Sequence, residues 1–339
     1  MFIINSYSLA VVFCFVTMLC WGSWGNTQKL AAKSWRYELF YWDYVIGRVL
    51  FSLLLALTMG SFGSEGRPFF RDIAQIDPMN ILWLVIGGVV FNASNILLSA
   101  STSIAGLSVA FPLGVGLALV LGVFNTYLED RAQGTAGNIP LLVIGVVLIV
   151  AAIICNGIAS GKKGESNISK KDNRKGIILA IVAGALMSLF YRFVARSMDL
   201  NNFANPAEGM ATPYTAIFIF SLGVLLSNFV FNTIVMRKPF VGEPVSYRQY
   251  FAGNARTHLV GMLGGAIWCL GSAFSYIASG KAGASISYAL GQGAPMVAAI
   301  WGVFIWKEFA GASKKVNWLL GAMFALFIAG LALIVISGN

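Results

Sequence analysis

Ten apolar runs, each long enough to cross a lipid bilayer, follow one another along this chain of 339 residues. A helix needs about 20 predominantly apolar residues to cross the hydrocarbon core, so the runs predict ten transmembrane helices. Backbone groups in hydrocarbon must be hydrogen-bonded internally, and we therefore expect an all-α integral membrane protein. The runs cover approximately residues 6–26, 42–62, 79–101, 104–128, 138–158, 176–198, 211–236, 257–280, 282–306 and 316–337.

The composition agrees with lipid as the main solvent. Hydrophobic residues make up 58% of the chain and charged residues 11%, whereas soluble domains contain roughly 45–50% and about 25%. The net charge of +10 comes from basic residues in the loops between apolar runs. This distribution is typical of membrane orientation and not of nucleic-acid binding. The expected partners are the lipid bilayer and a small-molecule substrate, with no nucleic acid.

Residues suited to catalysis or metal binding are scarce. The four cysteines lie inside apolar runs without CxxC spacing, and His258 is the only histidine. A metal site and a disulfide framework are therefore not expected. The segment Gly157–Lys163 is one residue short of a phosphate loop, and Lys163 stands where Ser or Thr would contact magnesium. We expect no catalytic residues, no metal, no cofactor and no enzyme activity.

A basic segment divides the chain into two halves that resemble each other. Residues 161–175 form the predicted cytoplasmic linker between a first five-helix repeat, 1–160, and a second, 176–339. A shift of 177 residues aligns three glycine-containing motifs without a gap: Gly87-Gly88 with Gly264-Gly265, Ala105-Gly106-x-Ser108 with Ala282-Gly283-x-Ser285, and Leu113-Gly114-x-Gly116 with Leu290-Gly291-x-Gly293. Because five is odd, the second repeat must enter the membrane inverted, which is the architecture of many secondary transporters.

The basic residues also predict the orientation. Sixteen lysines and arginines fall in loops on the side opposite the termini, and six fall on the terminal side. Cytoplasmic loops carry the excess of positive charge. We therefore expect a multi-pass protein of the cytoplasmic (inner or plasma) membrane with both termini outside.

Polar side chains inside the spans are the candidate substrate ligands, because they are costly in lipid and should face the interior. The candidates are Trp21, Ser23, Asn92, Asn95, Ser108, Trp268, Ser272, Tyr288 and Gln292. Amides and hydroxyls beside aromatic faces suit a small, neutral, polar ring compound. We expect Asn92, Asn95, Ser272 and Gln292 to point into one central cavity near Trp21. The alternative is hydrogen bonding between helices, and for the amides it stays open.

Charged residues in or beside the spans are candidates for coupling or gating: Asp43, Arg48, Glu129, Arg192 and Glu308. Arg48 and Arg192 each lie about two turns from a helix end, so they either line a cavity or extend to the interface. The three carboxylates mark helix ends, where a charge costs little. No acidic residue stands clearly at the midplane.

Short motifs follow one another along nearly the whole chain: Asp43-Tyr44, Leu57-Thr58-Met59-Gly60, Arg67-Pro68-x-Phe70, Gly87-Gly88-x-Val90, Ser94-Asn95, Gly106-Leu107-Ser108-Val109, Asn125-x-Tyr127-Leu128-Glu129-Asp130-Arg131, Tyr214-Thr215-Ala216, Trp301-Gly302 and Glu308. In this order and spacing the chain resembles the ureide permease family of the drug/metabolite transporter superfamily. It resembles the glucose/ribose and rhamnose porters more distantly. Two features depart from the plant members: the central linker is short and lacks their nucleotide-binding-like motif, and Trp21-Gly22-Ser23-Trp24 is closer to the sugar porters.

The resemblance implies a ten-helix permease that imports small polar solutes, with protons as the coupling ion and Asp43 and Glu129 as candidate carriers. Ureide permeases take up cyclic oxo-nitrogen compounds such as allantoin and nucleobases, and the sugar porters take up monosaccharides. The expected mechanism is alternating access. An exporter of amino acids or amphipathic drugs is the alternative within the superfamily, and a membrane receptor or scaffold is the alternative outside transport. The sequence is compatible with a monomer or a homodimer.

Overall fold

The computed structural model describes residues 1–31, 35–105, 107–134, 138–163, 170–240, 242–307 and 309–338. These residues form helices joined by loops, and none of them belongs to a named strand. The helices are α1 (Tyr7–Ser23), α2 (Gly25–Ala31), α3 (Tyr37–Leu57), α4 (Phe69–Gln75), α5 (Pro78–Ala105), α6 (Leu107–Gln133), α7 (Ile139–Lys163), α8 (Lys170–Arg196), α9 (Pro213–Arg237), α10 (Tyr247–Phe251), α11 (Ala255–Ala282), α12 (Ala284–Gly291), α13 (Ala294–Ile300), the π-helical turn η1 (Trp301–Ile305) and α14 (Lys314–Ile336).

Ten helical segments in the described part of the chain are long and apolar enough to cross a membrane. This confirms the predicted all-α class and the ten spans. The first span combines α1 and α2, and the ninth combines α12, α13 and η1. The helices of the fifth and sixth spans extend beyond their apolar runs into the basic linker, to Lys163 and from Lys170. Lysine and arginine are good helix formers, so the helix continues where the apolar run ends.

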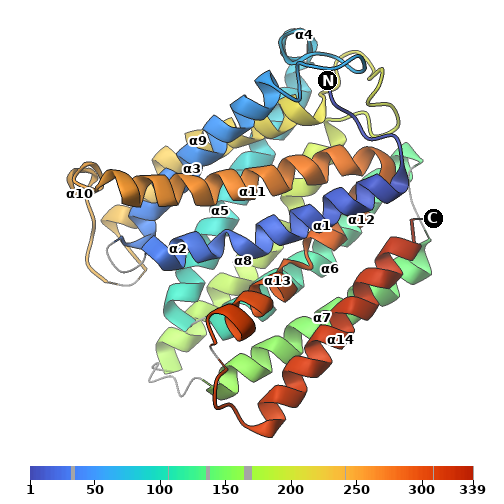
Figure 1. The fold of residues 1–339 in the computed structure, drawn as a ribbon. Helices are drawn as coiled ribbons and strands as arrows, with labels where there is room; N and C mark the ends of the chain where they lie inside the picture. Colours follow the sequence, from blue (N-terminus) through green and yellow to red (C-terminus); the bar gives the residue numbers. More distant parts are fainter. Residues whose placement is uncertain are drawn as a thin grey trace.

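Two helix groups and a peripheral pair make up the bundle (Figure 1). Helix α5 packs against α8 and α9, and α11 packs against α3 and α1. Helices α7 and α14 pair with each other at one edge of the bundle. The chain termini lie at the same end, and α10 lies at the opposite end (Figure 1). An even number of spans requires this arrangement.

Glycines allow the central helices to approach until their backbones touch. A methyl group at Gly265 of α11 would overlap the carbonyl oxygen of Tyr44 on α3. A methyl group at Gly88 of α5 would overlap the carbonyl oxygen of Phe220 on α9 in the same way. Gly88 and Gly265 are partners under the shift of 177 residues, so the two halves use the same packing device.

The helix boundaries follow the same shift. It carries the start of α5 at Pro78 to the start of α11 at Ala255, and the end of α5 at Ala105 to the end of α11 at Ala282. The start of α6 at Leu107 corresponds likewise to the start of α12 at Ala284. These matches agree with the predicted inverted repeat.

The ninth span is interrupted near its middle. Helix α12 ends at Gly291, and α13 begins at Ala294 with Pro295 in its first turn. Proline has no backbone N–H to donate and favours a helix start at this place. Interrupted spans are a recurrent feature of substrate and ion sites in transporters.

Candidate functional site

Trp268 of α11 lies where four spans meet. Its ring stacks on Trp21 of α1, with ring centroids 5.6 Å apart and an interplanar angle of 14°. It also contacts Phe91 of α5 at 4.5 Å and lies parallel to Phe220 of α9 at 6.4 Å. We refer to Trp21, Phe91, Phe220 and Trp268 as the central aromatic cluster.

Arg48 of α3 is fully buried against this cluster. The guanidinium carbon lies 3.9 Å from the centroid of the Trp268 ring, 4.8 Å from that of Phe91 and 5.3 Å from that of Phe220. Ring faces attract a cation, and the attraction grows when water is excluded. The side chain therefore points into the protein and not to the membrane interface, which were the two alternatives that the sequence left open.

The Arg48 guanidinium has no hydrogen-bond partner at Nε, Nη1 or Nη2 among the described residues. An arginine at the middle of a bilayer costs on the order of 3 kcal/mol on insertion scales, and that cost is usually reduced by a partner. The buried hydroxyls of Tyr44 and Tyr276 likewise have no hydrogen-bond partner among the described residues. The ring of Tyr44 lies 5.8 Å from the guanidinium carbon, and that of Tyr276 lies 6.2 Å from the ring of Phe220.

Three of the residues predicted to contact the substrate lie in direct contact with one another. Trp21 donates a hydrogen bond of 3.2 Å from Nε1 to Oγ of Ser272, one turn after Trp268 on α11. The ring of Trp21 also faces Gly291, where a methyl group would lie 2.7 Å from a ring carbon. Gln292 follows Gly291 at the interruption of the ninth span and is 7% exposed. Trp21, Trp268 and Ser272 thus form one contiguous group, and Gln292 follows the glycine that the Trp21 ring faces.

The two predicted asparagines take part in hydrogen bonds between helices. Asn92 accepts from the Tyr41 hydroxyl at 3.0 Å and donates to Oγ of Ser227 at 3.0 Å. Asn95 donates to the same Tyr41 hydroxyl at 3.0 Å. These bonds tie α3, α5 and α9 together, so in this conformation both amides have the interhelical role that was the alternative to substrate binding. Tyr41 joins the network to the site because its ring stacks on Tyr44 at 5.4 Å.

Two other residues predicted to contact the substrate are hydrogen-bonded to neighbouring helices. Ser23 accepts a hydrogen bond of 2.9 Å from Nε1 of Trp301 in η1. The Tyr288 hydroxyl donates to the carbonyl oxygen of Ala118 on α6 at 3.1 Å. The Ser108 side chain lies outside what the structure describes.

Asp43, a predicted coupling residue, is fully buried near the start of α3, at the end of the bundle predicted to be cytoplasmic. Its Oδ1 lies 2.7 Å from Nδ1 of His258 and accepts from the Tyr250 hydroxyl at 2.6 Å. Its Oδ2 accepts from Nε1 of Trp35 at 3.1 Å. We call Trp35, Asp43, Tyr250 and His258 the inner polar cluster. It joins α3, α10 and α11.

Tyr250 lies in the loop before α11, outside the spans. Burial raises the pKa of its phenol above the usual value, and the hydrogen bond to Asp43 and the charge of that carboxylate raise this pKa further. The phenol therefore remains a hydrogen-bond donor to Asp43 over the physiological pH range.

The remaining predicted charges lie elsewhere. Arg192 is half-buried on α8. The Glu129 side chain and the whole of Glu308 lie outside the described residues.

Two further carboxylates, which sequence analysis did not select, link helices at the end that carries the termini. Asp72 binds the guanidinium of Arg67 at 3.1 Å and accepts from the backbone N–H of Thr212 at 2.8 Å. Asp130 accepts from the backbone N–H groups of Ala284 and Ser285 at 2.6 and 2.7 Å. The first turn of α12 thus has a carboxylate at its positive end. The motif residues Arg67 and Asp130 were the signal that could have pointed to these contacts.

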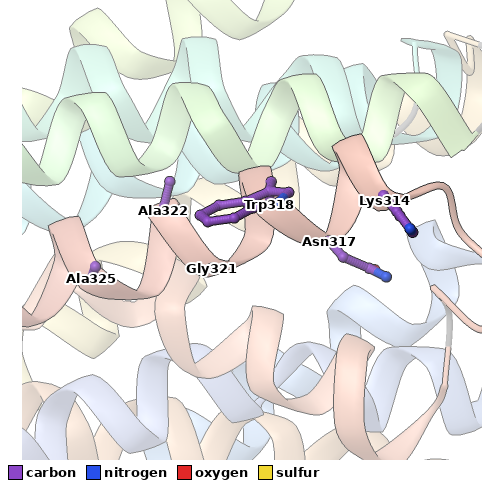
Figure 2. A pocket seen from close by; sticks show the side chains of 6 residues that line it. All are labelled: Lys314, Asn317, Trp318, Gly321, Ala322 and Ala325. Carbon is purple, nitrogen blue, oxygen red and sulfur yellow. The ribbon is translucent and has the colours of Figure 1, made fainter.

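A groove lies along α14, at the edge of the bundle (Figure 1 and Figure 2). Its lining residues all belong to α14: Lys314, Asn317, Trp318, Gly321, Ala322 and Ala325. The Trp318 side chain is 80% exposed. A tryptophan beside a lysine at a helix end is typical of residues at a membrane interface, so we assign this groove to the lipid-facing surface.

Comparison with known proteins identifies the family. The sequence profile of the ureide permeases matches residues 40–175 and 161–337. The chain belongs to the ureide permease family. Members of this family are transporters, so the chain is a multi-pass transporter and not an enzyme.

Individual relatives agree with this assignment over the full length. Ureide permease 1 of Arabidopsis thaliana is 23% identical over an alignment 396 positions long, which covers 100% of this chain and 99% of the relative. Ureide permease 2 of the same plant is also 23% identical, with the same coverage. The glucose uptake protein GlcU of Bacillus subtilis (strain 168) is 24% identical over 61% of this chain and 62% of its own. A solved structure titled "Crystal structure of protein" has the same fold, with a TM-score of 0.60, 15% identity and coverage of 96% and 97% of the two chains.

Proposed function

We propose that this chain is a secondary transporter that takes up a small polar ring compound of the ureide or nucleobase type across the cytoplasmic membrane by alternating access. The observation that carries the proposal is the meeting of α1, α3, α5, α9 and α11 around Trp268, Trp21 and Arg48. Helices of both predicted repeats contribute to this meeting. Secondary transporters with inverted repeats bind substrate at the repeat interface near the midplane.

The chemistry of the central residues favours a flat solute with polar edges. The rings of Trp21 and Trp268 offer aromatic faces, on which a planar ring stacks well. Ser272, Gln292 and the unpartnered tyrosine hydroxyls offer hydrogen-bonding groups at their edges. A cyclic ureide or a nucleobase combines both properties, and the plant relatives are named ureide permeases.

A monosaccharide is the second candidate, because GlcU, named a glucose uptake protein, is a relative over 61% of this chain. A sugar also stacks on tryptophan through its C–H face and bonds through its hydroxyls. A thermal-shift panel separates the two candidates: allantoin, uracil and hypoxanthine against glucose, ribose and rhamnose. Stabilisation by the first three compounds alone supports the ureide or nucleobase class, and stabilisation by the sugars alone refutes it.

Two groups of polar contacts fit the alternating-access part of the proposal. The inner polar cluster joins α3, α10 and α11 at one end of the bundle. The bonds of Asp72 to Thr212 and of Asp130 to Ser285 join helices at the other end. Breaking one group while the other persists would open the centre to one side at a time. We place the inner polar cluster in the cytoplasm, following the excess of lysine and arginine on that side.

Protons are the proposed coupling ion, and Asp43 is the proposed carrier. Asp43 is the buried carboxylate that also contacts a histidine, the residue whose ordinary pKa lies nearest neutrality. Protonation of the Asp43 carboxylate would remove its negative charge and weaken the contact with His258 that joins α3 to α11. The coupling proposal is tested by uptake into proteoliposomes with and without an imposed inward proton gradient. Uptake that ignores the gradient would leave facilitated diffusion as the mechanism.

A further inference from the structure

We propose that Arg48 is the group that recognises the transported solute, by donating hydrogen bonds to carbonyl or carboxylate oxygens of a planar compound seated against the central aromatic cluster. The inference rests on the proposed function and deepens it: it assigns a residue and a ligand chemistry to the site, and it disfavours solutes that offer only hydroxyls.

Charge is the first reason. The buried carboxylates of the described residues bind other groups: Glu38 pairs with Arg36, Asp43 with His258, and Asp72 with Arg67. Asp130 accepts from the first backbone N–H groups of α12. None of these carboxylates therefore pairs with Arg48, whose guanidinium lies against ring faces.

Hydrogen bonding is the second reason. Ring faces attract the charge of a guanidinium, but they do not satisfy its N–H donors, which lie in the guanidinium plane. All three nitrogens of Arg48 are buried without a partner among the described residues, and so is the hydroxyl of Tyr44 on the same helix. Buried polar groups in folded proteins almost always have a hydrogen-bond partner. Several unsatisfied groups close together therefore indicate a place where a ligand supplies the missing partners.

The type of donor selects the ligand. Guanidinium donates five N–H bonds in a fixed plane and accepts none, so its best partners are oxygens with exposed lone pairs. Carbonyl and carboxylate oxygens are such partners, and bonds from a charged donor to them are the strong ones. The hydroxyls of Tyr44 and Tyr276 can each donate one further bond. Sugar hydroxyls are weaker acceptors and must also find acceptors for their own protons, which this donor-rich group does not supply.

The position of Arg48 also fits a planar ligand. Its guanidinium carbon is 3.9 Å from the ring centroid of Trp268, and that ring stacks on Trp21. A flat solute beside these rings would present its edge, where carbonyl oxygens lie, to the guanidinium. The structural alternative is that Arg48 serves only as a cation–π contact holding α3 on α11.

The test measures affinity in the purified full chain by tryptophan fluorescence and thermal shift. The probes are uracil and allantoin as neutral carbonyl compounds, allantoate as a carboxylate, and glucose as a hydroxyl compound. The variants are Arg48→Gln, Arg48→Lys and Tyr276→Phe. Arg196→Gln is the matched control, because Arg196 is exposed on α8 and contacts the ring of Trp83 at 5.0 Å, away from the cluster.

The expected result is binding of a carbonyl or carboxylate probe to the wild type and at least a tenfold loss of affinity in Arg48→Gln. Arg48→Lys should recover part of the affinity, and more for allantoate than for the neutral rings, because lysine keeps the charge and loses the planar fork. Arg196→Gln should bind like the wild type. If Arg48→Gln does not fold, Tyr276→Phe, which keeps the ring, should still lower affinity severalfold.

Three outcomes would overturn the inference: unchanged affinity with a lowered melting temperature in Arg48→Gln, binding of glucose alone, or no binding of any carbonyl or carboxylate probe to the wild type. Uptake by proteoliposomes is measured separately. Arg48-dependent binding without uptake would refute the transport proposal while the recognition site stands. Uptake that does not depend on Arg48 would refute the recognition site while transport stands.

Discussion

Phe91 and Trp268 stand 177 positions apart in the sequence, and their ring centroids lie 4.5 Å apart in the structure. This distance along the chain is the shift that aligns the two halves, so in the proposed repeat each residue is the partner of the other. Two equivalent residues can touch only where the pseudo-twofold axis between their repeats passes close to both. The contact therefore marks the place at which an inverted repeat would hold its substrate, and Arg48 lies against both rings.

Close packing of α11 on α3 can be tested at Gly265. An added methyl group would overlap the carbonyl oxygen of Tyr44, so Gly265→Ala must push the two helices apart. We expect a loss of about 1–3 kcal/mol in stability, the usual range for overpacking, and loss of substrate binding. Gly321→Ala on α14 is the control, because a methyl group there meets no atom within 4 Å. Equal melting temperatures for the two variants in detergent would contradict the packing argument.

The predicted orientation is tested by cysteine labelling. In a background without the four native cysteines, we expect Asn339→Cys to react with a membrane-impermeant maleimide on intact cells. Ser166→Cys, in the basic linker that the sequence predicts to be cytoplasmic, should react only after the cells are opened. The reason is the charge asymmetry, with sixteen basic residues on the side of Ser166 and six on the other. Labelling of Ser166→Cys from outside would reverse the orientation.

The spans and the repeat could be predicted from the sequence because both depend on local hydrophobicity and on glycine spacing. The same holds for part of the site. Trp268 and Ser272 are one turn apart on a single stripe, so they had to share a face. The contact of Trp21 with this stripe is tertiary. However, an indole N–H inside a span is costly to leave without a hydrogen-bond partner, and this favours an orientation toward the protein interior.

The rest depends on contacts between distant residues. His258 lies 215 positions from Asp43, and nothing local indicates that an imidazole near a helix end should meet a carboxylate two turns into another helix. Arg48 could extend to the interface or turn inward, and the sequence does not distinguish the two. Tyr41 joins Asn92 and Asn95, but tyrosine in an apolar run counts as an apolar residue and hides this role.

The interhelical role of Asn92 predicts a structural phenotype. Removing its amide by Asn92→Ala takes away the acceptor of the Tyr41 hydroxyl proton and the N–H donor that bonds to Oγ of Ser227. We expect about 1–3 kcal/mol of lost stability, the cost of a buried unsatisfied group, with affinity for the substrate nearly unchanged. Ser227→Ala should act through the same bonds, so the double variant should lose less than the two single losses combined. Additive losses would argue against a shared network.

Gln292 is the predicted amide for which a ligand role stays the stronger hypothesis. It follows Gly291, which faces the Trp21 ring, at the interruption between α12 and α13. We expect Gln292→Ala to weaken binding roughly tenfold, which corresponds to about 1.4 kcal/mol, and to lower the melting temperature little. Gln249→Ala, in the loop helix α10, serves as a glutamine control outside the spans. Reduced stability with unchanged affinity would show that Gln292 has a structural role and does not bind the substrate.

The inner polar cluster predicts how uptake responds to a proton gradient. Asp43→Asn removes the group that would carry the proton and nearly keeps the shape of the side chain. Its amide oxygen can still accept from Tyr250, whereas the amide nitrogen replaces the oxygen that accepts from Trp35. We expect this variant to lose stimulation by an inward proton gradient while exchange of labelled for unlabelled substrate across the liposome membrane continues. Exchange needs only the alternation of the loaded carrier, whereas gradient-driven uptake needs release of the proton inside.

His258→Gln should weaken the response to the proton gradient without abolishing it, because the Asp43 carboxylate remains. Glu208→Gln, at an exposed loop position, is the control. An Asp43→Asn protein that still accumulates substrate under the gradient would exclude Asp43 as the carrier and direct the search to Glu129.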